Sequence, residues 1–209
     1  MIKNDLHQYE NKLINQGYQY IAGVDEAGRG ALCGPVVAAS VIFPLGFNID
    51  GINDSKKLTP KQRSHFREII INNCLDYSIS IVDSSTIDKI NILEASRLAM
   101  NNCIKQLKVK PDFVLTDAMK IEFTEHISII KGDQKSISIA AASIIAKTTR
   151  DEYMEKLALD YPEYGFDRHF GYGTKIHLTA INELGIIEEH RKTFSPVSNY
   201  LTKRTTTIK

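Results

Sequence analysis

Residues 20–30 read YIAGVDEAGRG and join a short apolar run to two adjacent acids and a glycine–arginine–glycine turn. The apolar run is short and bounded by turn residues, which predicts a buried strand over residues 20–25. An unpaired charge inside a protein is very costly, so Asp25 and Glu26 at the end of this strand need a metal ion or a basic ligand to compensate them. The stretch therefore predicts a strand that delivers carboxylates to a binding site.

Two more acids follow apolar segments in the same way. Asp117 ends the run FVLTD, and Asp133 follows ISIIKG. Carboxylate oxygens are the ligands that Mg²⁺ and Mn²⁺ prefer, whereas zinc sites are usually built with Cys or His. We therefore predict that the four acids hold a pair of divalent ions of the kind that cleaves phosphodiesters. The alternative for each acid alone is an ordinary turn former or helix cap.

The order of the predicted strands gives this site a geometry. Asp25 and Asp117 both end strands, and if those strands are parallel neighbours, both acids open on the same edge of the sheet. Adjacent residues of a strand point to opposite faces, so Glu26 joins the site only if the strand ends or bends at Asp25. The following Ala27 and Gly28 make such a bend feasible.

The rest of the chain alternates strands and helices, which is typical of an α/β domain with a mixed sheet. Further strands are expected at residues 36–43, 76–83, 113–117 and 127–131, and helices at 5–16, 59–73, 85–107, 136–158 and 174–184. Neither a repeat nor a linker divides the 209 residues, so we expect one domain over 1–209. The basic residues from about 201 are expected to form a loose tail.

Composition narrows the class of protein. Hydrophobic residues make up 43% of the chain and charged residues 24%, which excludes a disordered protein. A net charge of +1 means that any nucleic acid must be bound by locally placed Lys and Arg. Three scattered cysteines without a CxxC pair argue against a disulfide framework. Because the sequence shows neither a signal peptide nor a long apolar stretch, we expect a cytoplasmic protein without a membrane partner.

The glycine–arginine–glycine turn allows two interpretations. The spacing from Gly23 to Gly28 resembles the phosphate-binding loop GxxxxGK[ST], but Arg29 and Gly30 replace the residues that would hold phosphate and magnesium. A nucleotide hydrolase is therefore the first rival function. Gly28 and Gly30 also allow the backbone to approach a sugar or phosphate closely, with a plain tight turn as the structural alternative.

Several basic and aromatic residues are candidates for binding a nucleic acid. Lys56 lies in a polar loop, and Lys147 lies on the predicted helix 136–158, where it could instead pair with Asp151 one turn away. Tyr172 stands among glycines in FGYGT, as a contact to a sugar requires, or as a packing residue of the loop. The histidines at 169, 177 and 190 lack the spacing of metal ligands.

Over residues 18–200 the chain resembles ribonuclease HII, the type 2 ribonuclease H family. The segments that carry the resemblance are GVDEAGRGALCGPVVAA, NDSKKLT, LTD at 115–117, KGDQKSISIAAASIIAKTTRD, YPEYGFDRHFGYGT and FSPV. The resemblance implies a ribonuclease H-like α/β fold, a mixed five-stranded sheet flanked by helices, with a C-terminal helical part from about 160 that grips substrate.

The resemblance also implies an activity. The expected enzyme hydrolyses the RNA strand of RNA–DNA hybrids and incises 5′ of single ribonucleotides in duplex DNA, leaving 3′-hydroxyl and 5′-phosphate ends. It would use Mg²⁺ or Mn²⁺ in a two-metal mechanism, act as a monomer and take part in ribonucleotide excision repair and DNA replication. A binding module that keeps the fold without the chemistry is the second rival.

Site residues carry over by position. The four acids of the family match Asp25, Glu26, Asp117 and Asp133, of which the first three match its usual metal ligands. The turn Gly28, Arg29 and Gly30 and the side chain of Tyr172 match the groups that recognise the ribose 2′-hydroxyl, the group that distinguishes RNA from DNA. Ala118 stands where the family usually has glycine, so we expect a position that tolerates a small residue, or strain if its φ is positive.

Overall fold

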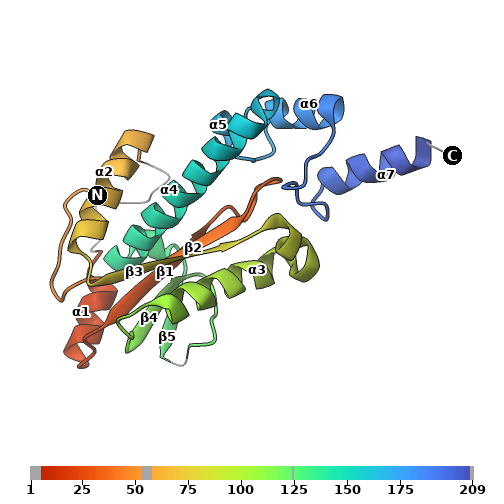
Figure 1. Cartoon of the computed structure of the whole chain (residues 1–209). Helices are drawn as coiled ribbons and strands as arrows, with labels where there is room; N and C mark the ends of the chain where they lie inside the picture. Colours follow the sequence, from red (N-terminus) through yellow and green to blue (C-terminus); the bar gives the residue numbers. More distant parts are fainter. Residues whose placement is uncertain (1–5, 53–57, 124, 208–209) are drawn as a thin grey trace.

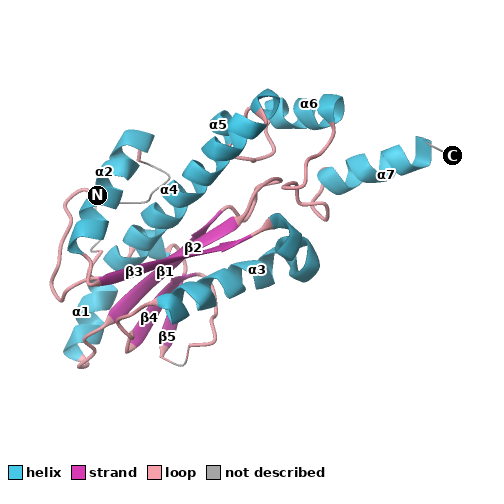
Figure 2. Ribbon diagram, in the orientation of Figure 1, coloured by secondary structure: helices cyan, strands magenta, loops and turns pink. Residues whose placement is uncertain are grey.

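A mixed five-stranded sheet forms the centre of the structure, with helices on both of its faces (Figure 2). The structure is a computed structural model that describes residues 6–52, 58–123 and 125–207. The strands are β1 Ile21–Ala27, β2 Val36–Ile42, β3 Asp76–Val82, β4 Phe113–Asp117 and β5 His126–Ile129. Their order is β3-β2-β1-β4-β5, with β1, β4 and β5 parallel and β2 antiparallel to both of its neighbours. The predicted fold class is confirmed.

Helices fill most of the remaining described chain. They are α1 Gln8–Asn15, α2 Pro60–Asn73, α3 Ser84–Gln106, α4 Ile137–Asp160, α5 Phe166–His169, α6 Lys175–Leu184 and α7 Val197–Thr207, with short 3₁₀ turns at Gly132–Gln134 and Pro162–Tyr164. The capping box predicted at the start of α2 is present, because Thr59 and Gln62 bond each other's backbone N–H. Within the described ranges, no helix combines the length and apolar character needed to cross a bilayer.

The core consists of two layers, one on each face of the sheet. Helix α3 covers one face, and α2 and α4 cover the other (Figure 1). Strand residues alternate between these layers, as the period of two requires: Ala38 of β2 packs in the α3 layer, whereas its neighbour Ala39 packs with Ile145 of α4. The first half of α4 is buried nearly all round, as its apolar sequence predicts.

A glycine sets the distance between β1 and α4. A Cβ on Gly23 would lie 2.1 Å from the carbonyl carbon of Ser138, so no side chain fits between this strand and the helix. Residues two apart on a strand share a face, so Asp25 is directed toward α4 as well. Close packing of the strand on the helix therefore places the first acid beside the helix surface.

Strands β1 and β4 stop pairing where their acids begin. Their last paired residues are Val24 and Thr116, so Asp25 and Asp117 are the next positions in register on two parallel neighbours. The sequence predicts a strand that ends at Asp25, but β1 continues to Ala27 through pairing with β2 alone. The edge of the sheet at which the acids lie therefore begins where β1 stops pairing with β4, and not where β1 ends.

Two segments differ from expectation. The long helix α3 contains a break at Asn91, where φ is 66°, and the Asn91 side chain accepts bonds from the next turn of backbone and so begins a second helical segment. The expected loose tail from 201 is instead the second half of α7 (Figure 1). Val197 explains this, because it is fully buried against Leu32 and Ile181 and anchors the start of that helix.

Candidate active site

A cleft of about 630 Å³ opens where β1 and β4 separate. Its lining residues come from the end of β1 and the turn that follows, from the end of β4, from α2 and α4, and from the loop after α5: Asp25, Glu26, Ala27, Gly28, Arg29, Gly30, Arg63, Asp117, Ser143, Lys147 and Tyr172. Eight of the ten site residues predicted from the sequence are among them. Segments nearly 150 positions apart in the chain thus share one concave surface.

The carboxylates are held in place by backbone and by α4. Asp25 is buried, and its Oδ1 accepts a hydrogen bond of 2.7 Å from the N–H of Glu26. Ser143 of α4 donates a second bond to the Asp25 carboxylate. Across the cleft, Oδ1 of Asp117 accepts a 2.8 Å bond from the N–H of Gly132. These bonds fix the orientation of two of the acids before any ligand is present.

Negative charge is crowded in this cleft. Burial first, and then the charges of Glu26 and Asp117, raise the pKa of Asp25 well above its usual value. Burial also raises the pKa of Glu26 to about 7, although the guanidinium of Arg29 at 3.3 Å opposes that shift. The ionised forms of these acids are therefore disfavoured in the cleft, and a bound cation would offset that cost.

The donors present fit a hard divalent cation. Oε2 of Glu26 is buried and has no hydrogen-bond partner, so this oxygen has an unused lone pair in the cleft wall. The surrounding acids Asp25 and Asp117 also supply only oxygen, the donor that Mg²⁺ and Mn²⁺ prefer. Within the described parts of the chain, no three His, Cys, Asp or Glu side chains form a ready-made metal cluster. The acids line the cleft without forming a closed cage.

Two predicted site residues are not seen in the cleft wall. Asp133 is buried in the 3₁₀ turn Gly132–Gln134, next to the residue that bonds Asp117, and does not line the cleft. Its catalytic role stays a prediction. Lys56 lies outside the described residues.

The turn after β1 needs glycine at its first position. Gly28 has φ +96°, in the region that favours glycine, and a Cβ there would lie 2.1 Å from Nε of Arg150. Gly30, by contrast, faces open space, and nothing would lie within 4 Å of an added Cβ. The turn is therefore packed tightly behind and open in front, as the approach of a ligand to its backbone requires.

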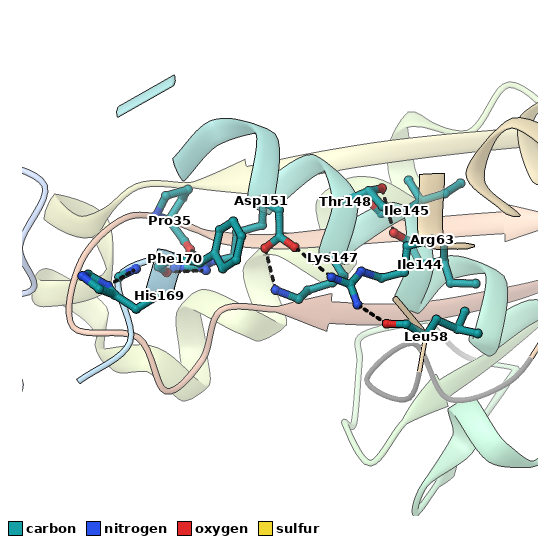
Figure 3. Close-up of polar contacts among 12 residues, drawn as sticks. Pro35, Leu58, Arg63, Ile144, Ile145, Lys147, Thr148, Asp151, His169 and Phe170 are labelled. Carbon is teal, nitrogen blue, oxygen red and sulfur yellow. Dashed lines mark hydrogen bonds and ion pairs between the residues drawn. The ribbon is translucent and has the colours of Figure 1, made fainter. Parts of the chain in front are cut away.

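Two cations reach the cleft from neighbouring helices. Lys147 and Arg63 both pair with the carboxylate of Asp151, which lies between them (Figure 3). Arg63 also donates a 2.6 Å bond to the carbonyl of Leu58. The pairing of Lys147 with Asp151 confirms one alternative from the sequence, and Lys147 nevertheless still lines the cleft.

Sequence reasoning missed Arg63 and Ser143. Arg63 shares one face of α2 with the buried Phe66 and Ile70, so a charged residue stands on an apolar helix face. A charged residue on an apolar helix face is therefore the sequence signal that could have identified Arg63 as a site residue. Ser143 gave none, because a small polar residue in the buried helix α4 differs little from its alanine neighbours.

Tyr172 lies at the rim of the cleft. The residue is 36% exposed, and its ring stacks on the guanidinium of Arg150, whose Cζ lies 5.3 Å from the ring centroid. Its carbonyl is held by Nδ1 of His177 at 3.0 Å, and Nε2 of His177 is 3.1 Å from Nε2 of His190. His169 stacks on the His177 ring. The three histidines thus pack together behind Tyr172.

Ala118 adopts the positive φ that would strain a residue other than glycine. Its φ is +50°, in the left-handed region, and its N–H donates to the carbonyl of Ile129 at 3.0 Å. An alanine pays a steric penalty in this region that glycine does not. Local strain therefore lies directly beside Asp117.

Comparison with known proteins assigns a family. A family model described as ribonuclease HII matches residues 22–197. The ribonuclease HII of Acholeplasma laidlawii is 54% identical over 193 residues, 92% of this chain and 96% of the relative. That of Bacillus cytotoxicus is 50% identical over 198 residues, 94% of this chain and 76% of the relative. The crystal structure of ribonuclease H2 from Pyrococcus horikoshii OT3 superposes with a TM-score of 0.76 at 28% identity, covering 88% of this chain and 98% of that one.

Proposed function

The chain belongs to the ribonuclease HII family and is a ribonuclease H endonuclease, and we propose that it incises duplex DNA 5′ of single embedded ribonucleotides as well as the RNA strand of RNA–DNA hybrids. One observation carries the proposal. A single cleft joins the acids of β1 and β4 to the glycine turn and to Tyr172, so a phosphodiester and the adjacent ribose can be held together. The products would carry 3′-hydroxyl and 5′-phosphate ends.

Divalent cations complete this proposal. Asp25, Glu26 and Asp117 would hold them, with Asp133 supporting the set, and the orphaned oxygen of Glu26 supports that assignment. Held by these residues, Mg²⁺ or Mn²⁺ would supply activation of the attacking water and neutralisation of the charge on the phosphate and on the departing 3′-oxygen. Because the pKa of Glu26 is raised to about 7, cations would compete with protons for its carboxylate near neutral pH.

Other residues that line the cleft would bind the phosphate and the ribose of the substrate. Arg63 and Lys147 share a single carboxylate, that of Asp151, so the three groups keep a net positive charge facing the cleft, which suits a phosphate of the bound strand. The open front of the turn at Gly30 allows its backbone to approach the ribose. The exposed ring of Tyr172 offers a flat surface to the same sugar.

Incubation with a labelled duplex tests the proposal directly. The substrate carries one ribonucleotide in otherwise DNA strands, with an all-DNA duplex as control and a long hybrid for comparison. We expect incision 5′ of the ribonucleotide with Mg²⁺ or Mn²⁺ and none with EDTA or on the all-DNA duplex. An uncut ribonucleotide duplex beside a cut long hybrid would reject the finer activity, and neither substrate being cut would indicate a binding module.

We also propose a cytoplasmic location and a monomeric state for the protein. All three cysteines are free, which fits a protein of the reducing cytoplasm. We expect a monomer that encloses its substrate without a second copy, and gel filtration with light scattering tests this.

A further inference from the structure

A buried arginine from the C-terminal part of the chain lies directly behind the glycine turn. Arg191 has no exposed surface, and all the hydrogen bonds of its guanidinium go to backbone carbonyls. Nη1 donates to the carbonyl of Arg29 at 2.9 Å, and Nη2 donates to the carbonyl of Gly28 at 2.7 Å. Nε and Nη2 both reach the carbonyl of Gly34.

These bonds determine which way the turn presents its peptide groups. A trans peptide places its C=O and its N–H on opposite sides. Because the carbonyls of Gly28 and Arg29 face Arg191, the N–H groups of Arg29 and Gly30 point away from it, toward the open side of the turn. Among the described residues, no hydrogen-bond acceptor engages either of these two N–H groups.

The segment around Arg191 is itself fixed to the chain that follows the turn. The N–H of Arg191 donates to the carbonyl of Leu32 at 2.8 Å, and the N–H of Gly34 donates to the carbonyl of Glu189 at 2.9 Å. Although burial lowers the pKa of Arg191 to about 9, the group is charged at neutral pH. A charged donor strengthens bonds to carbonyls, so the guanidinium holds the turn more firmly than a neutral group could.

We propose that Arg191 is a positioning residue for ribonucleotide recognition, which holds two carbonyls of the turn inward so that the N–H groups of Arg29 and Gly30 are presented to the 2′-oxygen of a ribose. The inference rests on the proposed function. What it adds is that the direction of these backbone donors is set by a residue more than 160 positions away.

Binding without cleavage tests the inference. The affinities of wild type and Arg191→Lys are measured by fluorescence anisotropy in EDTA, for two duplexes that differ only by one 2′-hydroxyl. Lysine keeps the charge, but its single nitrogen cannot reproduce the spread of the three guanidinium nitrogens that reach these carbonyls. We expect the preference for the ribonucleotide duplex to fall about tenfold, the scale of one lost hydrogen bond, with the affinity for the all-DNA duplex unchanged. Arg97→Lys, at an arginine that bonds the carbonyl of Lys120 on the outer face of α3, should leave both affinities unchanged.

The outcomes separate the inference from the proposed function. A folded Arg191→Lys protein that keeps the wild-type preference, or that loses affinity for both duplexes equally, overturns the inference. Wild type that cleaves the ribonucleotide duplex but binds both duplexes equally also overturns it. Wild type that neither cleaves nor prefers the ribonucleotide duplex rejects the proposed function instead.

A second measurement needs no variant, in case Arg191→Lys does not fold. In ¹⁵N-labelled wild type, the amide resonances of Arg29 and Gly30 should shift when the ribonucleotide duplex replaces the all-DNA duplex. Gly17, which lies in an exposed turn away from the cleft, should give the same resonance with both duplexes. Unmoved resonances of Arg29 and Gly30 would overturn the inference.

Discussion

Gly23 of β1 lies so close to Ser138 of α4 that a Cβ on the glycine would come within 2.1 Å of the serine carbonyl carbon. Two residues further along the strand, Asp25 accepts a bond from Ser143 of the same helix. The close approach at Gly23 thus sets the separation at which the acid and the helix meet.

Replacement of Gly23 by alanine should destabilise the fold strongly. The added methyl group meets the α4 backbone at Ser138 and Ile139, a clash that no rotamer change can relieve, so we expect a loss of about 3 kcal/mol or more in the free energy of unfolding. Urea denaturation measures it. Gly30→Ala is the matched control, because nothing lies within 4 Å of the added Cβ, and its stability should match wild type. Equal stability of both variants would contradict the packing described here.

Asp25→Asn should stabilise the protein without metal while abolishing cleavage. The raised pKa of Asp25 indicates that its charge is unfavourable in the folded state, so its removal should raise the melting temperature in EDTA at pH 8. Saturating Mg²⁺ should raise the melting temperature of wild type and leave that of the variant nearly unchanged. The exposed Asp167→Asn is the control, with wild-type cleavage expected. A variant with wild-type turnover would remove Asp25 from the catalytic set.

Ala118→Gly should stabilise the protein modestly. Glycine relieves the strain of φ +50° but loses more freedom on folding than alanine, so the net gain should be about 0.5–1 kcal/mol. Ala158→Gly, in the regular helix α4, should instead cost about 1 kcal/mol. Thermal melts of the two variants decide the matter, and a loss of stability in both would mean that the backbone at Ala118 is unstrained.

His177 and His190 should each contribute a loss of stability as pH drops below about 6.5, opposed by Asp25 and Glu26, whose raised pKa makes the folded protein take up protons in the same range. Burial lowers the pKa of each ring to about 4, so between these values the unfolded chain binds protons that the folded protein does not. The loss for one such histidine at pH 4 is about 3 kcal/mol. Urea melts at pH 8, 6 and 5 measure it, and His177→Gln should flatten the dependence. An unchanged slope in that variant would place the effect elsewhere.

Tyr172→Ala should impair discrimination more than general binding. Tyr172 is partly exposed at the rim of the cleft, and its carbonyl is bonded by His177, so the loop should keep its path in the variant. We expect kcat/KM on the single-ribonucleotide duplex to fall by about tenfold or more, with affinity for the all-DNA duplex within about twofold of wild type. Equal losses on both duplexes would mean that the tyrosine serves only general binding.

The local sequence pattern was sufficient to predict the strands and the helix start that carry the site. The apolar run before Asp25, the run before Asp117 and the capping box at Thr59 each correspond to an element in the structure. These signals are local, since they depend on the alternation of a strand or on the first turn of a helix. The five-stranded arrangement itself was expected from family resemblance and not from pattern, because strand order depends on contacts distant in sequence.

Side chains whose partners lie far away in sequence could not be predicted. Arg150 is fully buried on α4, and its guanidinium donates to the carbonyls of Cys33, Pro35 and Phe170, which no local sequence pattern indicates. The contacts among the three histidines are equally invisible in sequence, because they depend on how α5 and α6 fold back beside residue 190.

The bonds from Arg191 to the turn have a consequence for the order in which the protein is made. The glycine turn leaves the ribosome early, but the arginine that orients it is 162 residues later. A nascent chain can therefore form β1 and β2 long before its turn can distinguish ribose from deoxyribose.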